Sequence, residues 1–122
     1  MTNKEIQSIV NHHPSFRDKL FCRGFLLTDA PINDKEYPFY GNWTKETIGK
    51  YQIFVHNKQS YYVYQTGGAY NVLVGHAYNP VDGDYDEQTI LKKLVDDKSG
   101  NVKIDYLNQL TGIYTLIGIG GG

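Results

Sequence analysis

The sequence YNVLVGHAY at residues 70–78 decides the fold, because it is an apolar run of side chains that favour strands. Two similar runs come before it: YQIFVH at 51–56 and YYVYQT at 61–66. The polar segment 57–60 between those two has a length typical of a β-hairpin loop. The three runs therefore predict an antiparallel meander in which each strand pairs with the next.

A helical pattern replaces the strand pattern after this run. Residues 82–86 (DGDYD) form an acidic turn, and Asp86 is placed to cap the helix that follows. An EF-hand calcium loop would require a glycine where Glu87 stands and a glutamate where Lys93 stands, so this motif is excluded. Four apolar side chains recur at helical spacing and predict one buried helix face: Ile90, Leu91, Leu94 and Val95.

Residues 104–119 predict a second short helix and a last strand. The helix presents three apolar side chains: Ile104, Leu107 and Leu110. Gly112 is placed as its C-terminal stop. The strand, 113–119, is apolar on both faces, which favours a central position in its sheet. The glycines at 120–122 are expected to form a flexible tail.

Shorter elements are expected in the first half of the chain. Residues 3–10 show helical spacing of apolar residues, and Pro14 ends that pattern. Residues 24–28 (GFLLT) are a strand candidate, and 29–42, with two prolines and a glycine, predict a long loop. All these patterns together predict an α+β fold in one domain over residues 1–119.

Composition and charge exclude several classes of function. Apolar residues make up 40% of the 122 residues, which is typical of a folded chain. The 12 basic and 13 acidic residues nearly cancel, so electrostatics give no reason to expect nucleic acid or a lipid surface. Cys22 is the single cysteine, which suits a reducing compartment. Without an apolar leader or a run long enough to span a bilayer, the protein is expected to be cytoplasmic, with no membrane partner.

Three motifs in the second half carry a resemblance to a known family. They are VGHAYN at 74–79, DYD at 84–86 and LNQLTGIY at 107–114. With their order of strand, acidic turn, helix, short helix and apolar strand, residues 72–119 resemble the core of class II glutamine amidotransferase domains. Such domains form the N-terminal part of asparagine synthetases. The resemblance implies an N-terminal-nucleophile hydrolase fold, here a partial αββα sandwich of antiparallel sheets with helices. The segment 25–29 and Trp43 are more similar to degenerate asparagine-synthetase-like proteins than to the enzymes.

The resemblance also implies a glutaminase mechanism whose parts this sequence does not retain. In the family a cysteine at the mature N-terminus attacks the amide. This chain begins MTN instead, and the residues around Thr2 have a pattern typical of the start of a helix. The family's oxyanion-binding asparagine and glycine correspond to Val74 and Gly75, so the side-chain donor is lost while the backbone amide could remain as a donor. The arginine motif that binds the substrate carboxylate has no counterpart, since Arg17 and Arg23 stand in a different context.

Three residues remain as a remnant of the substrate pocket: Gly75, His76 and Asp86. Asp86 matches the acid that holds the amino group of the substrate, and it also has a structural role as a helix cap. We expect no catalytic residue, no cofactor and no metal. The sequence therefore predicts a pseudoenzyme, a non-hydrolytic amidotransferase-like domain with a structural or partner-binding role.

Two other interpretations stay open. The chain could be a fragment of an active ATP-dependent amide-forming synthetase that uses ammonia or another amine. It could also be a small ligand-binding domain that stacks a sugar or peptide on the tyrosine-rich run 61–64. Family members continue past the last strand into further strands. A sheet edge is therefore expected to bind a synthetase domain or a second copy of this chain.

The cysteine and the histidines favour structural roles. Cys22 within LFCR is expected to be a buried apolar thiol rather than a nucleophile. His12 and His13 are adjacent, so their side chains point apart in any regular element. His56 and His76 lie on strands of one expected sheet and could approach each other, but no third metal ligand is visible.

Overall fold

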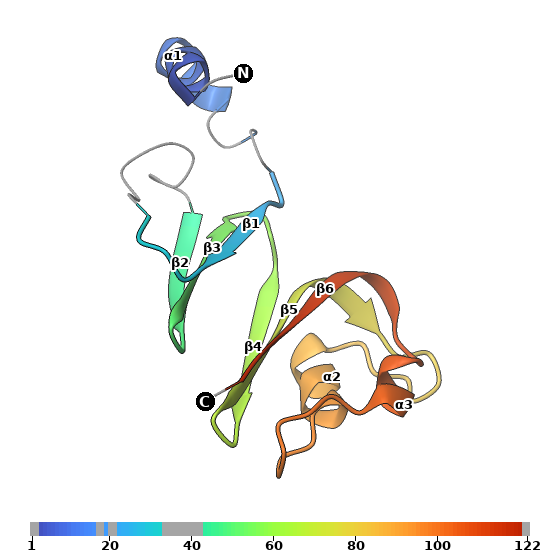
Figure 1. Cartoon of the computed structure of the whole chain (residues 1–122). Coiled ribbons are helices and arrows are strands. Elements are labelled where there is room, and N and C mark those ends of the chain that lie inside the picture. Colours follow the sequence, from blue (N-terminus) through green and yellow to red (C-terminus); the bar gives the residue numbers. More distant parts are fainter. Residues whose placement is uncertain (1–2, 17–18, 20–21, 33–42, 121–122) are drawn as a thin grey trace. The chain divides into compact units, whose positions relative to one another are not determined.

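A computed structural model describes residues 3–16, 19, 22–32 and 43–120 (Figure 1). Helices and two antiparallel three-stranded sheets make up the fold, which confirms the expected α+β class. The chain divides into two compact units, Met1–Gln59 and Ser60–Gly122. No helix in the described ranges is long and apolar enough to cross a membrane. The single domain and the αββα layering expected above stay predictions.

The first unit contains one sheet and an N-terminal helix. Its elements are α1 (Asn3–His12), a 3-10 turn η1 (Pro14–Phe16), β1 (Phe25–Thr28), β2 (Trp43–Ile48) and β3 (Tyr51–His56). The strand order is β1-β3-β2, with both neighbours antiparallel to β3. The central strand is the most buried, and Ile53, Phe54 and Val55 form the core of this sheet. Of the long loop expected at 29–42, residues 33–42 lie outside the described ranges.

The expected hairpin between 51–56 and 61–66 is wrong. β3 is paired on one side with β1 and on the other with β2, so it has no free edge for the next strand. Its hairpin partner is β2, which follows the sequence WTKETI and was not expected as a strand. A turn of two residues, Gly49 and Lys50, joins β2 to β3, and Gly49 adopts a φ of 61° that suits glycine.

The second unit builds a separate sheet with two helices. Its elements are β4 (Tyr61–Thr66), β5 (Ala69–Tyr78), α2 (Glu87–Leu94), α3 (Ile104–Leu107) and β6 (Thr111–Ile119). The strand order is β4-β5-β6, all antiparallel. Gly67 and Gly68, with φ of 58° and 81°, close the β4–β5 hairpin through a turn that needs positive φ at both positions.

The core of the second unit lies between β5 and α2. Leu73 and Ala77 project from one face of β5 and form a buried cluster with the apolar face of α2. The four helix residues predicted to be buried are confirmed as buried: Ile90, Leu91, Leu94 and Val95. Tyr62 and Tyr64 of β4 pack against the same cluster. The helix and the sheet therefore stabilise each other by removing one continuous apolar surface from water.

Two expectations for the last third of the chain are wrong. The last strand is an edge strand rather than a central one, because β5 occupies the centre of the sheet. Gly112 does not end a helix; it lies inside β6 with a φ of 130°. α3 is only one turn long, so it cannot bury a full apolar face, and the side chain of Ile104 stays 61% exposed.

Candidate functional site

Gly75 of the expected pocket remnant lies in the middle of β5 and is buried. Its backbone N–H donates to the carbonyl oxygen of Ser60 at 2.9 Å. Its φ is 110°, and an added Cβ would overlap the carbonyl oxygen of Ile113 in β6. Glycine is therefore required here by the close approach of two strands, which is a structural reason for its presence.

His76 follows Gly75 in β5 but points to the other face of the sheet. Its side chain is 71% exposed, and its Nδ1 lies 3.0 Å from Oε1 of Glu87, whose side chain is only 13% exposed. Glu87 is the first residue of α2, so this contact joins the sheet to the helix start. The arrangement is a surface pair and not a buried catalytic dyad.

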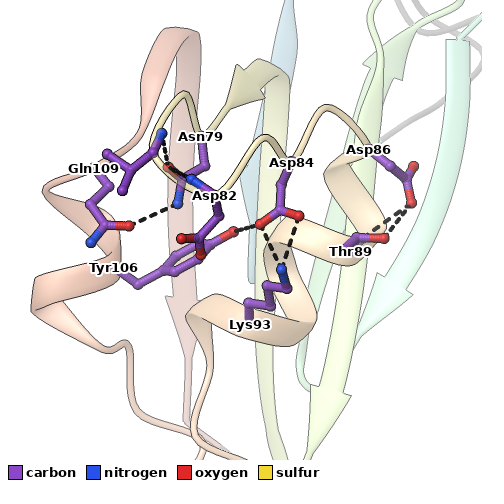
Figure 2. A network of polar contacts seen from close by, with 9 residues as sticks. Asn79, Asp82, Asp84, Asp86, Thr89, Lys93, Tyr106 and Gln109 are labelled. Atoms are coloured by element: carbon purple, nitrogen blue, oxygen red, sulfur yellow. Dashed lines mark hydrogen bonds and ion pairs between the residues drawn. The ribbon is translucent and has the colours of Figure 1, made fainter.

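Asp86 is the N-cap of α2, as predicted (Figure 2). Its Oδ2 accepts the backbone N–H of Thr89 at 3.2 Å and the Thr89 hydroxyl at 2.9 Å. A capping carboxylate satisfies amide groups that the helix itself leaves without partners. In the described structure no hydrogen bond connects Asp86 with Gly75 or His76. The three remnant residues therefore have separate structural roles.

A polar network that the sequence did not predict surrounds the turn between β5 and α2 (Figure 2). Its centre is Asn79, whose side chain is fully buried. Asn79 Oδ1 accepts the backbone N–H groups of Val81 at 2.9 Å and Asp82 at 3.2 Å. Its Nδ2 donates to Oε1 of Gln109 at 3.0 Å. Asn79 thus holds the acidic turn in shape and ties it to the segment after α3.

Asp84 connects the same turn to both helices. Both of its carboxylate oxygens lie 2.9 Å from Nζ of Lys93 in α2. The hydroxyl of Tyr106 in α3 donates to its Oδ2 at 3.0 Å. The hydrogen-bonded ammonium of Lys93 holds the pKa of Asp84 below its usual value. Burial, reinforced by the neighbouring Asp84 carboxylate, raises the pKa of Tyr106 to about 12.

An open pocket of about 590 Å³ lies beside this network. Its lining residues carry charges of both signs: Asp82, Lys93, Lys103, Ile104, Asp105, Tyr106 and Gln109. The one lysine that belongs to the network, Lys93, is bound to Asp84. Among the described residues, neither a cysteine nor a histidine lines the pocket.

The tyrosine-rich run does not present a free platform of rings. Tyr62 and Tyr64 share one face of β4 and pack against the core of the second unit. The Tyr64 hydroxyl donates to Oδ1 of Asp97 at 2.6 Å, and this hydrogen bond raises the pKa of Tyr64. These contacts favour a role in the sheet over sugar or peptide stacking.

The remaining candidates differ from their expected positions. Cys22 is exposed in a turn before β1, so the expected buried thiol is wrong; a turn leaves the side chain in water. His56 and His76 do not share a sheet, because one belongs to β3 and the other to β5. Within the described ranges, no group of three or more His, Cys, Asp or Glu side chains could hold a metal ion. Thr2 and Arg17 lie outside those ranges.

Comparison with known proteins found no matching family model, no matching curated protein and no matching solved structure. The resemblance of residues 72–119 to glutamine amidotransferase domains therefore stays a prediction. The sequence signals of the polar network were Asn79 before a proline and the acidic turn behind it. The part played by Tyr106 had no signal, because it lies 22 positions from Asp84 in the chain.

Proposed function

We propose that residues 1–119 form a glutamine amidotransferase-like domain, with the resemblance carried by residues 72–119, and that it has no glutaminase chemistry. Its role is structural or partner-binding, in an asparagine-synthetase-like protein of the cytoplasm. The observation that carries the proposal is the hydrogen bond from the Gly75 amide to Ser60. In the family that the sequence resembles, this glycine amide and an asparagine side chain stabilise the oxyanion.

Both oxyanion donors are lost at this site. Val74 has no polar side chain, and the amide of Gly75 already donates to a carbonyl within the sheet. Loss of one such donor costs about 3 kcal/mol of transition-state stabilisation. Loss of both removes the two donors that the family uses to stabilise the tetrahedral intermediate of amide hydrolysis.

Asp86 supports the same conclusion. A substrate-binding carboxylate needs free lone pairs that face the ligand. The Oδ2 atom of Asp86 is engaged by both the amide and the hydroxyl of Thr89. The carboxylate that matches the family's amino-group ligand therefore caps a helix here through one of its two oxygens.

A glutaminase assay tests the proposal. The purified chain is incubated with L-glutamine, and glutamate is measured by a coupled dehydrogenase reaction, with a competent class II amidotransferase as the positive control. We expect glutamate at the level of the buffer blank. Release of glutamate that is removed by Cys22→Ala or Thr2→Ala would overturn the proposal. Val74→Asn is the matched variant that restores the side-chain donor of the family. It should also be inactive, because the Gly75 amide remains hydrogen-bonded to Ser60.

The partner-binding role is tested separately. The two partners expected for a sheet edge are a synthetase domain and a second copy of this chain. Size-exclusion chromatography of the chain mixed with an ATP-dependent amide-forming domain distinguishes the two partners. Binding to the synthetase domain gives a mixed complex, whereas self-association gives a complex that contains this chain alone.

A further inference from the structure

β6 is an edge strand that lacks the usual protection of such strands. Its nine residues, TGIYTLIGI, include no charge and no proline. It pairs with β5 along its whole length in one continuous register, without a bulge. Among the described residues, β5 is its single strand partner. Proteins commonly blunt such edges with lysine, proline or bulges, and a long neutral edge favours pairing with another chain.

The hydrogen-bonding groups on the outer side of β6 follow from the sheet register. The Gly75 amide points toward β4, because it donates to Ser60 next to that strand. Backbone groups alternate in direction along a strand, so the amides of Val74 and His76 point toward β6. Their partners Thr115 and Ile113 therefore point toward β5. It follows that four residues of β6 turn their N–H and C=O groups to the open edge: Gly112, Tyr114, Leu116 and Gly118.

The sequence of β6 is close to symmetric about Thr115. Read outward from this residue, Tyr114 corresponds to Leu116, Ile113 to Ile117, and Gly112 to Gly118. An antiparallel pair of two β6 strands centred on Thr115 would place each residue opposite a similar one. The pairing would also bring the outward-pointing residues of the two strands opposite each other, so that their backbone groups form hydrogen bonds.

We propose that β6 pairs with β6 of a second copy of this chain, antiparallel and centred on Thr115, and makes a six-stranded sheet across a two-fold axis. A two-fold interface uses the same surface on both copies, and a strand with a symmetric sequence satisfies this condition by itself. The proposal names the partner for the binding role proposed above and rests on that role.

The pairing also covers the most exposed large apolar side chain of the described structure. Ile113 is 91% exposed, and in this register it lies opposite Ile117 of the second copy on the face away from α2. Tyr114 and Leu116 meet on the other face, beside the core. The second edge strand, β4, is a weaker candidate, because it is only six residues long and YYVYQT has no such symmetry.

A charge at the two-fold axis tests the register. Sedimentation velocity over a range of concentrations is expected to show a dimer for the natural chain. Thr115→Lys places two ammonium groups directly opposite each other, so we expect loss of the dimer. Gln65→Lys adds the same charge to the exposed face of β4 and should leave the dimer intact. An equimolar mixture of Thr115→Lys and Thr115→Glu should restore a dimer, since opposite charges then meet.

A disulfide provides a second measurement that does not depend on the charge variants folding well. Residues opposite each other in a pair without backbone hydrogen bonds have Cα atoms about 4.5 Å apart, which a disulfide can bridge. In a Cys22→Ser background, Thr115→Cys is expected to oxidise to a linked dimer, and Gln65→Cys is not. Circular dichroism verifies the fold of each variant.

The outcomes separate the two proposals. A natural chain that stays monomeric at its highest soluble concentration overturns the β6 pairing. A dimer that survives Thr115→Lys, or that Thr115→Cys does not link, also overturns it. Glutamate release by a dimeric chain would overturn the proposed function and leave the pairing intact.

Discussion

The hydroxyl of Tyr106 lies 3.0 Å from Oδ2 of Asp84 and joins α3 to the turn before α2. The same carboxylate binds Lys93 of α2 through both oxygens. One acidic residue thus connects two helices that are separated by a stretch of turns. Asp84 titrates at acidic pH and Tyr106 at alkaline pH, so the two ends of the pH scale report on different bonds of this connection.

At alkaline pH we expect the Tyr106 bond to be lost. The pKa of Tyr106 is raised from 10.0 to about 12 in the folded chain, so the neutral phenol stabilises the fold below pH 10 and this contribution disappears as the pH rises toward about 12. Urea unfolding across this range should show a steeper loss of stability for the natural chain than for Tyr106→Phe. Tyr85→Phe, in the exposed part of the turn, is the control and should follow the natural chain. Equal slopes for all three chains would contradict the assignment.

At acidic pH the Asp84–Lys93 pair should fail. Because the folded pKa of Asp84 is below its ordinary value of 3.8, its stabilising contribution is present above pH 3.8 and is lost as the pH falls through the folded value. Lys93→Met should lower the melting temperature at neutral pH. It should also make the melting temperature depend less on pH in the acidic range. Lys92→Met alters the neighbouring exposed lysine and should do neither. Melting curves between about pH 2 and pH 6 decide the matter.

Gly75→Ala should strongly destabilise the second unit. The added Cβ overlaps the carbonyl oxygen of Ile113, and the φ of 110° is a region that side chains rarely adopt. We expect the free energy of unfolding to fall by about 3 kcal/mol or more. Gly83→Ala is the matched control: its φ is 74°, but nothing lies within 4 Å of the new atom, so the cost should be about 1–2 kcal/mol. Similar losses for both variants would show that strand approach is not the cause.

Asn79→Ala should destabilise the turn between β5 and α2. The substitution removes the acceptor of two backbone amides and the donor to Gln109 from a position that is fully buried. The unfolding free energy should fall by about 2–4 kcal/mol, because more than one polar group is left unsatisfied. Asn108→Ala changes an exposed asparagine nearby and should stay within about 0.5 kcal/mol of the natural chain. Chemical denaturation measures both values.

Local patterns in the sequence were sufficient for most elements of the second unit. The apolar face of α2 and its Asp86 cap depend on spacing within a few residues, and both were predicted. Strand pairing was not local: β3 takes partners from before it in the chain, so the hairpin toward β4 failed. β2 was missed because WTKETI owes its strand conformation to the ladder with β3 rather than to apolar content.

The candidate site was predicted in part for the same reason. Asp86 was placed correctly by its position before a helix, and Asn79 was visible as part of the motif at 74–79. The hydrogen bonds of Asn79 to Gln109 and of Asp84 to Tyr106 join segments 30 and 22 positions apart. Such contacts depend on the docking of α3, which no local pattern specifies.

The pairing of β5 with β6 has a consequence for the order in which this unit folds. β4 and β5 are joined by a turn of two glycines, so their ladder closes within a short stretch of chain. β6 returns to β5 only after both helices, with Tyr78 opposite Thr111. Closing that long loop is expected to be the slower event, and it can begin only once Thr111 has been synthesised and has left the ribosomal exit tunnel. The β4–β5 hairpin and α2 therefore stay partly exposed to water until the last strand has been synthesised.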